Sequence, residues 1–146
     1  MLSIGNLAKS TGVKVPTIRF YEQIGLLPAP DRTDSDRRVY DQVAVRRLAF
    51  IRHARELGFA LDAIRTLLGL ADHPERDCAE ANALALEQLA TVDAKIAQLQ
   101  ALRGELKQMV DGGCQGAAAE CRVIETLADH GRCAAPHAAP ARHALA

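Results

Sequence analysis

Apolar residues recur at steps of three and four along the middle of the chain. The positions that share this spacing are Leu89, Val92, Ile96, Leu99, Leu106 and Val110. Such steps place apolar side chains on one face of a helix, in the heptad spacing of a coiled coil, and only Arg103 interrupts them. Gly112 and Gly113 then end the pattern. Because a single helix cannot bury this face, the sequence predicts a long dimerisation helix over residues 78–111.

Two shorter helical patterns occupy the N-terminal region. Ser3 is suited to cap a first helix, and Gly12 lies in the turn that follows it. Pro16 suits the first turn of a second helix, which is expected over residues 15–24. Two short helices joined by a three-residue turn with a glycine match the helix-turn-helix pattern, whose second helix enters the DNA major groove. The apolar side chains expected to point inward are those of Ile18, Phe20, Leu26 and Leu27.

A polar segment with basic residues follows the second helix. Residues 32–40 are predicted to form a small β-hairpin, or wing, with its tip near residues 34–36. Arginines and a tyrosine hydroxyl on a wing are suited to contact DNA phosphates. Such contacts position a protein on DNA but carry no information about the base sequence. The alternative is that this segment is a solvated loop with ordinary surface arginines. Its position directly after a helix-turn-helix favours DNA binding. Two further helices are expected over residues 42–57 and 61–70.

Charge is distributed unevenly, although its formal net value is zero. Residues 1–65 carry 11 basic and seven acidic side chains, whereas residues 66–146 carry seven and 11. The basic N-terminal part is consistent with an anionic partner. No apolar run approaches the ~20 residues of a membrane span and no signal-peptide pattern is present, so we expect a cytoplasmic protein with no membrane contact. In that compartment the four cysteines are better suited to metal or redox chemistry than to structural disulfides.

The cysteines flank the long helical pattern. Cys78 and Cys114 are 36 residues apart, so a continuous helix would separate them by ~50 Å. They cannot share a ligand within one chain, but an antiparallel dimer would bring Cys78 of one protomer to Cys114 and Cys121 of the other. Two identical sites of three thiolates would result. The alternative is that these cysteines are unrelated and buried as small hydrophobic residues.

The predicted elements form a mainly α fold in five consecutive parts. The parts are a winged helix-turn-helix DNA-binding domain over residues 1–70, a hinge over 71–77, the dimerisation helix over 78–111, a metal-binding loop with a short helix over 112–130, and a flexible tail over 131–146.

Five motifs carry a resemblance to the MerR family of transcriptional regulators. They are IGNLA at Ile4–Ala8, VPTIRFYE at Val15–Glu22, GLLP at Gly25–Pro28, RRVY at Arg37–Tyr40 and RELGF at Arg55–Phe59. The resemblance extends to about Leu127 and implies a winged helix-turn-helix joined to an antiparallel coiled-coil dimer. It also implies a homodimer that bends a promoter whose two polymerase elements are too far apart. Binding of the effector untwists the DNA, so that RNA polymerase can initiate transcription.

The same resemblance assigns residues that contact DNA. Carried over by position, they are Thr17, Arg19, Tyr21, Arg37, Arg38 and Tyr40, with Lys14 and Arg32 as further candidates.

The effector implied by the resemblance is a soft divalent metal ion. A cysteine at position 78 is typical of the divalent-metal branch, whereas the copper-type branch carries serine there. Three thiolates suit Cd(II), Pb(II) or Hg(II) and can also hold Zn(II). The six residues between Cys114 and Cys121 resemble the cadmium- and lead-responsive members. We therefore rank Cd(II) or Pb(II) first and Hg(II) or Zn(II) next.

The C-terminal region contains further metal-binding residue types. They are His130, Cys133, His137 and His143. These residues could supply a fourth ligand or a second metal site, or the tail could simply happen to contain them.

Two other classes of function are weighed against this one. A thiol-based redox sensor of the same fold would use the same cysteines to form disulfides or sulfenic acids. A drug-binding relative would carry a larger C-terminal domain than this chain has. No histidine has an evident pairing with a cysteine in a formed pocket, and no Ser/His/Asp or paired-carboxylate arrangement is present, so we expect no enzymatic activity.

Overall fold

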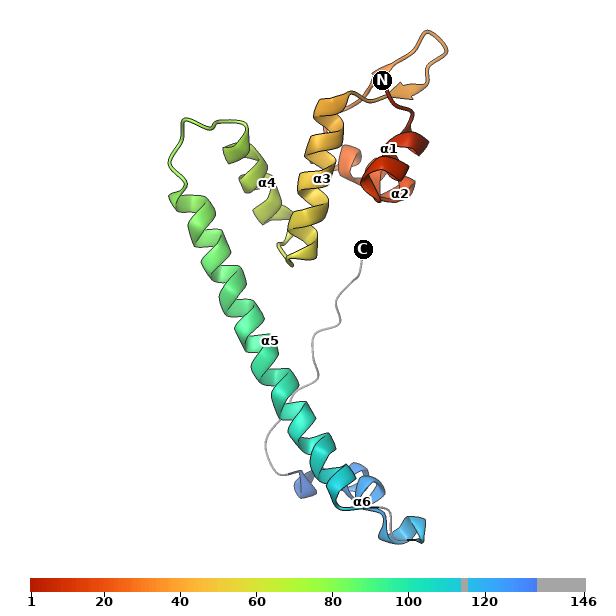
Figure 1. Cartoon of the computed structure of the whole chain (residues 1–146), viewed down its shortest axis with the longest axis vertical. Helices are drawn as coiled ribbons and strands as arrows, with labels where there is room; N and C mark the ends of the chain where they lie inside the picture. The colour runs from red at the N-terminus through yellow and green to blue at the C-terminus, as the bar shows by residue number, and fades with distance from the viewer. Residues whose placement is uncertain (114–115, 134–146) are drawn as a thin grey trace. The chain divides into compact units, whose positions relative to one another are not determined.

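The computed structural model describes residues 1–113 and 116–133. The chain divides into two compact units, the first ending at Gln88 and the second beginning at Leu89. Ten helical and strand elements follow one another along the described residues (Figure 1). Helices dominate both units, which confirms the prediction of a mainly α fold. No helix in the described part of the chain is both long enough and apolar enough to cross a membrane.

The first unit begins with the predicted helix-turn-helix. Helix α1 covers Ile4–Thr11 and helix α2 covers Val15–Gln23. Ser3 caps α1 by accepting a hydrogen bond from the Asn6 N–H at 3.2 Å. Gly12 ends α1 in the left-handed conformation, with φ of 72°. Pro16 lies in the first turn of α2, as expected for a residue that lacks an N–H.

The wing is a short antiparallel hairpin. Strand β1 covers Asp31–Arg32 and strand β2 covers Arg38–Val39, with Arg32 opposite Arg38. An isolated bridge between Leu2 and Tyr40 attaches the N-terminus to the end of the wing. The predicted hairpin is confirmed, although pairing begins one residue earlier than expected.

Helices α3 and α4 complete the core of the first unit. Helix α3 covers Gln42–Glu56, with Asp41 as its cap, and helix α4 covers Leu61–Ala71. The large side chains that are fully buried are Leu7, Ile18, Leu26, Leu27, Leu48, Ile51 and Ile64. These residues come from both helices of the helix-turn-helix, from the turn after α2 and from α3 and α4, so one core fixes the position of the second helix.

Three arginines of α3 and α4 stabilise the ends of neighbouring segments. Their side chains donate hydrogen bonds to backbone carbonyls, from Arg47 to Leu26 at 3.1 Å, from Arg52 to Thr11 at 2.5 Å and from Arg65 to Ile24 at 2.8 Å. The last carbonyls of a helix have no partner within the helix, so cationic donors are favourable there. These basic side chains therefore serve the internal structure of the unit.

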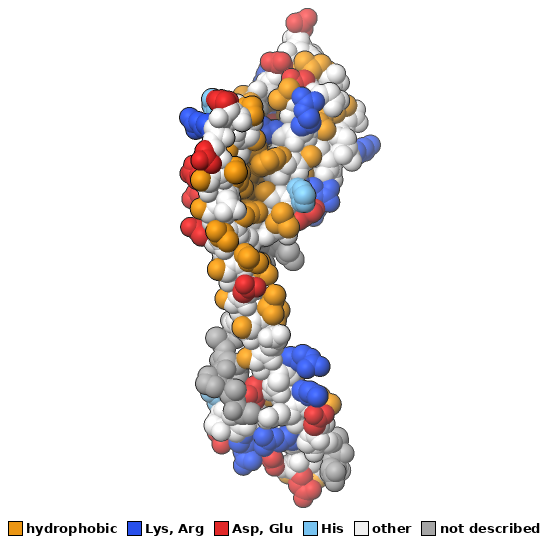
Figure 2. Space-filling view, turned by 60° about the vertical axis from the view of Figure 1, so that its left-hand side comes forward, with side chains coloured by type: hydrophobic (Ala, Val, Ile, Leu, Met, Phe, Trp, Pro, Cys, Tyr) orange, Lys and Arg blue, Asp and Glu red, His pale blue; other side chains and the backbone are white. Residues whose placement is uncertain are grey.

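Helix α5 is a single helix of 33 residues, Ala79–Asp111, which confirms the predicted long helix. Among the described residues, nothing covers the apolar side chains that form the seam of this helix. Leu89 and Leu99 are each 56% exposed and Val110 is 73% exposed. Figure 2 shows hydrophobic side chains following this helix.

The C-terminal elements are short. A turn of 3-10 helix, η1, covers Ala118–Glu120, helix α6 covers Arg122–Ala128, and a second turn, η2, covers His130–Arg132. Met109 of α5 and Thr126 of α6 are buried in the second unit. Helix α6 agrees with the predicted short helix, whereas η2 extends into residues 131–132, which were expected to belong to a flexible tail.

Candidate DNA-binding surface and metal-ligand positions

The second helix, α2, presents two kinds of surface. Lys14, directly before it, and Arg19 are exposed, and Thr17 is partly buried. Ile18 is completely buried and Tyr21, three residues later on the same face, is 5% exposed. Basic side chains therefore occupy the solvent side of this helix.

Phe20 is a correction to the sequence analysis. It was expected to point inward, but it is 45% exposed. Ile18 and Tyr21 lie three positions apart on the inward face, so a side chain two positions after Ile18 is rotated away from that face. Phe20 and Tyr21 line a shallow depression with Arg55 of α3. Tyr21 occupies the core position that had been assigned to Phe20.

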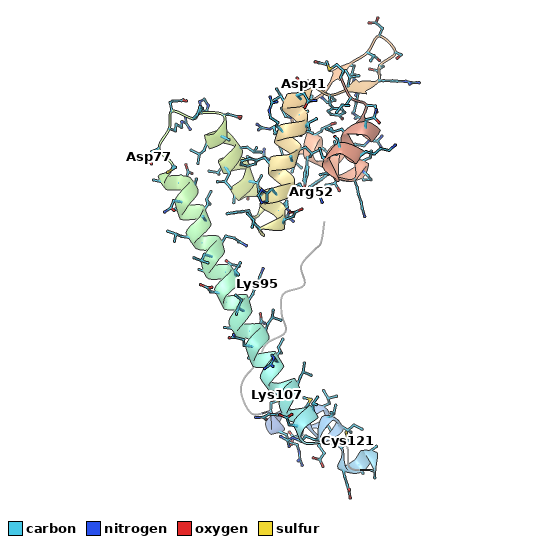
Figure 3. All side chains as sticks on the ribbon, in the orientation of Figure 1. Asp41, Arg52, Asp77, Lys95, Lys107 and Cys121 are labelled. Carbon is cyan, nitrogen blue, oxygen red and sulfur yellow. The ribbon has the colours of Figure 1, made fainter. Side chains whose placement is uncertain are left out.

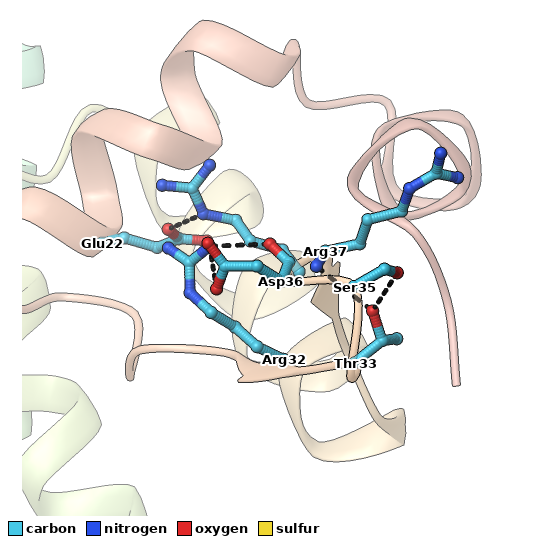
Figure 4. Close-up of polar contacts among 7 residues, drawn as sticks. Glu22, Arg32, Thr33, Ser35, Asp36 and Arg37 are labelled. Carbon is cyan, nitrogen blue, oxygen red and sulfur yellow. Dashed lines mark hydrogen bonds and ion pairs between the residues drawn. The ribbon is translucent and has the colours of Figure 1, made fainter.

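The wing contains the other predicted DNA contacts. Arg32 and Arg37 are exposed, and Arg38 is partly buried. Arg32 forms an ion pair with Asp36 at 3.4 Å across the hairpin turn (Figure 4). Arg37 makes no such pair among the described residues, so its guanidinium remains available to a phosphate.

Glu22 joins the wing to α2 and was not identified from the sequence. Its carboxylate accepts a hydrogen bond from the Tyr40 hydroxyl and pairs with the Arg38 Nε at 3.4 Å. Tyr40 is 2% exposed; burial raises the pKa of its hydroxyl, and the Glu22 carboxylate raises it further. The sequence did offer one signal for Glu22. It is the single acidic residue of the motif VPTIRFYE, and it lies about one helical turn after Arg19. The predicted roles of Tyr21 and Tyr40 in binding DNA remain predictions.

A depression separates α2 from the wing. Its volume is about 420 Å³, and Arg19, Arg32 and Arg38 are among its lining residues. Glu22 is the acidic residue of the lining. Arginine is suited to phosphate because its planar fork of donors matches the phosphate oxygens. This depression is the most basic concave surface of the first unit among its described pockets.

The described candidate metal ligands lie next to helix starts. Cys78 is an exposed free thiol directly before α5, and its carbonyl accepts the Asn82 N–H at 2.9 Å. Cys121 is a partly buried free thiol directly before α6 (Figure 3). Cys114 lies outside the described residues. Within residues 1–113 and 116–133, no three His, Cys, Asp or Glu side chains are close enough to hold a metal ion.

Cys133 has a different environment. Its thiol is hydrogen-bonded to the Glu105 carboxylate, which is 6% exposed. Desolvation is the largest cause that raises the pKa of Cys133, followed by the charge of Glu105, and Arg122 opposes the shift. A raised pKa favours the thiol over the thiolate that a metal ion requires. His130 is described and interacts with other groups, whereas His137 and His143 lie outside the described residues.

Comparisons with known proteins agree with this geometry. A family model for the MerR HTH family regulatory protein matches residues 2–70, and one for the MerR DNA-binding region matches residues 45–109. The HTH-type transcriptional regulator ZntR of Escherichia coli K12 is 39% identical over 130 residues, which cover 87% of this chain and 92% of the relative.

Two solved structures are also similar. The transcription regulator PbrR691 from Ralstonia metallidurans CH34, in complex with lead(II), is 41% identical, with a TM-score of 0.73, 87% of this chain covered and 99% of the other. The regulator MerR from Bacillus megaterium MB1, in complex with mercury(II), is 32% identical, with a TM-score of 0.65 and coverage of 88% and 100%.

Proposed function

This chain belongs to the MerR family of transcription regulators, and we propose that it binds promoter DNA as a homodimer and changes transcription when a soft divalent metal ion binds. As a member of this family, the protein is not an enzyme. The observation that carries the proposal is the order of three features along one chain: a basic helix-turn-helix with a wing, a 33-residue helix with an exposed apolar seam, and cysteines at both ends of that helix.

The DNA-binding surface consists of the exposed basic residues of α2 and the wing. Arg19, Arg32 and Arg37 are each exposed in the free chain, where they can reach phosphates without a large rearrangement. We assign Thr17, near the start of α2, to base edges in the major groove, because the first residues of a recognition helix make such contacts. Lys14, Arg38, the hydroxyl of Tyr21 and Tyr40 complete the proposed set; the single O–H of Tyr40 donates to Glu22 in the free chain, so its contact with a phosphate would require that bond to be exchanged.

The metal ion is proposed to bind between protomers. Cys78 of one protomer and Cys114 and Cys121 of the other supply three thiolates. An antiparallel pairing of α5 supports this arrangement, because it buries the exposed seam and lays the start of one helix beside the end of the other. Soft thiolate ligands favour Cd(II) or Pb(II), then Hg(II) or Zn(II). The complexes of the two solved relatives with lead(II) and mercury(II) support this class of ion.

The bound metal acts as the effector. It supplies a bond between the two protomers that exists only in the dimer state with the three thiolates together, so its binding energy shifts the population toward that state. In that state the two winged domains would untwist the promoter, and RNA polymerase could then use an overlong spacer. His130, Cys133, His137 and His143 remain candidates for a secondary site.

The test is an anaerobic titration of the reduced protein with Cd(II), Pb(II), Hg(II) and Zn(II), followed by thiolate-to-metal charge-transfer absorption. We expect one tight ion per protomer, and loss of tight binding in both Cys78→Ser and Cys121→Ser. Cys133→Ser is the matched control and should retain the site.

Mixing the two defective variants tests whether protomers share the site. Random re-association of Cys78→Ser with Cys121→Ser chains makes half of the dimers mixed, and each mixed dimer has one complete site. The absorption should therefore recover to about one quarter of the wild-type value. No recovery would contradict a shared site. Absence of tight metal binding in the wild type would instead favour the redox sensor, in which the same thiols are oxidised.

A further inference from the structure

The carboxylate of Glu22 lies on the basic surface that is proposed to bind DNA. Its side chain is 10% exposed and lies between α2 and the wing. A negative charge at such a place repels phosphates and loses hydration as it becomes buried, so it needs compensating interactions. The described residues provide two, both from the wing: the Tyr40 hydroxyl and the Arg38 Nε.

The pairing leaves a specific part of Arg38 unused. The ion pair involves Nε, which is buried and forms no hydrogen bond among the described residues, so the charge of Glu22 is its compensating contact. The two terminal nitrogens of the guanidinium are not part of this pair. Arg38 lines the depression of about 420 Å³ together with Arg19 and Arg32. Glu22 therefore pairs with one of the three arginines that line the depression.

Tyr40 provides the second connection. Its backbone is bridged to Leu2, with N···O distances of 2.7 and 2.8 Å, and its ring belongs to the core. Because its hydroxyl also donates to Glu22, the end of the wing is attached both to the N-terminus and to α2. The hairpin has only two residues in each strand, so its own pairing is a weak constraint on its direction.

We propose that Glu22 is a positioning residue that fixes Arg38 and Tyr40 of the wing against α2 and thereby shapes the basic depression to receive a DNA backbone phosphate. This inference rests on the proposed DNA-binding function. It assigns to an acidic residue a favourable role in binding an anion, because preorganised arginines lose less conformational freedom when the phosphate binds.

The sign of a charge-removing substitution distinguishes positioning from simple electrostatics. If Glu22 acted only through its charge, Glu22→Gln would remove a repulsion and strengthen binding to DNA. If Glu22 positions Arg38, the same substitution weakens binding, because a neutral amide holds a guanidinium less firmly than a carboxylate does. The two accounts therefore predict opposite changes.

The experiment uses the metal-free full chain and a duplex that the wild-type protein selects from a random-sequence pool, with affinity measured by fluorescence anisotropy. We expect Glu22→Gln to bind about tenfold more weakly. Glu22→Asp keeps the charge but shortens the reach, and it should also bind more weakly. It also serves as the test if the glutamine variant does not fold, as judged by circular dichroism. Asp34→Asn is the control, because it removes an exposed carboxylate from the wing tip and should leave affinity unchanged or slightly higher.

Two further readouts show whether Glu22 acts through the wing. In a background of Arg38→Gln with Tyr40→Phe, Glu22→Gln should have almost no additional effect. In the protein without DNA, Glu22→Gln should lower the pKa of the Tyr40 hydroxyl, as measured by an ultraviolet tyrosinate titration. The substitution removes the negative carboxylate that accepts the hydrogen bond from this hydroxyl. Tyr40→Phe identifies which of the two tyrosine transitions belongs to Tyr40.

The possible failures are distinguishable. Unchanged or tighter binding by Glu22→Gln, or wild-type affinity in Glu22→Asp, would overturn the inference while DNA binding stands. An equal loss in the background without Arg38 and Tyr40 contacts would also overturn it, because Glu22 would then act elsewhere. If the wild-type chain selected no duplex, the proposed function would fail, and this inference would fail with it.

Discussion

At the scale of single residues, two independent constraints require glycine at position 12: the backbone conformation of the turn and the side chain of Arg52. Its φ is 72°, a conformation that residues with a Cβ rarely adopt. A Cβ on Gly12 would also lie 1.9 Å from Nη1 of Arg52, the nitrogen that bonds the Thr11 carbonyl. Any larger residue must therefore adopt a strained backbone and displace that guanidinium.

We predict that Gly12→Ala destabilises the first unit by about 2 kcal/mol, from left-handed strain and the loss of one hydrogen bond. The measurement is the free energy of unfolding in urea. Gly69→Ala is the matched control, since Gly69 lies within α4 and a Cβ there meets no atom within 4 Å among the described residues. That variant should be as stable as the wild type or up to about 1 kcal/mol more stable. Equal effects of the two substitutions would contradict this account.

Tyrosines illustrate a second point at this scale. The family resemblance assigns Tyr21 and Tyr40 to DNA by position, and a tyrosine hydroxyl on the wing is suited to phosphates. The structure places both rings in the core, and Tyr40 directs its hydroxyl to Glu22. A residue type with an apolar body and a polar end can satisfy both environments, so its type alone does not reveal which end faces the partner.

At the scale of elements, the turn η2 is attached to α5 by polar contacts. The Cys133 thiol is hydrogen-bonded to the Glu105 carboxylate of α5. The Arg132 carbonyl accepts a hydrogen bond from the Arg122 guanidinium of α6 at 3.3 Å. Arg132 also pairs with Glu125 at 3.6 Å. These contacts involve few apolar atoms, so they hold a short segment in place through charge and hydrogen bonding.

We predict that Cys133 reacts slowly with iodoacetamide near neutral pH, because its raised pKa leaves little thiolate. Glu105→Gln should lower that pKa and accelerate the reaction, which mass spectrometry of the labelled peptide would measure. In the wild type, the rate should rise only above the pH at which an ordinary thiol ionises. Asp129→Asn is the control, since the charge of Asp129 has the smallest effect on the pKa of Cys133 and an asparagine can still cap η2. An unchanged rate of alkylation in Glu105→Gln would show that Glu105 does not keep the Cys133 thiol protonated.

At the scale of the whole molecule, the exposed seam of α5 determines how many chains assemble. Seven side chains at heptad spacing, six of them apolar, face outward from one helix. Leaving such a face in water is unfavourable by roughly 25 cal/mol for each Å² of apolar area. A second copy with the same face can cover it by two-fold symmetry.

We predict that Leu99→Gln weakens the dimer at least tenfold, because it places an uncompensated amide in the buried seam. Sedimentation equilibrium over a range of protein concentrations measures the change. The control is Ala94→Gln, which adds the same side chain on the opposite face of α5 and should leave the dimer intact. A seam that tolerates glutamine at Leu99 would show that the chains associate elsewhere.

The sequence by itself determined the parts of this protein that depend on neighbouring residues. Ser3, Gly12 and Pro16 mark helix ends at the predicted places, since capping and turn formation act over three or four residues. The seam of α5 was readable for the same reason, because its spacing is a local periodicity. The motifs that carry the family resemblance are equally local.

Only the tertiary structure decided which side chains are free to act. Arg52 and Thr11 are 41 residues apart, Tyr40 and Glu22 are 18 apart, and Cys133 and Glu105 are 28 apart. No periodicity relates such pairs, because their contacts depend on how helices pack around a common core. The same packing buries Tyr21 in the core where Phe20 had been predicted. It also brings Glu22 of α2 into contact with Arg38 and Tyr40 of the wing. Chemistry that depends on distant contacts therefore became visible only when the chain was folded.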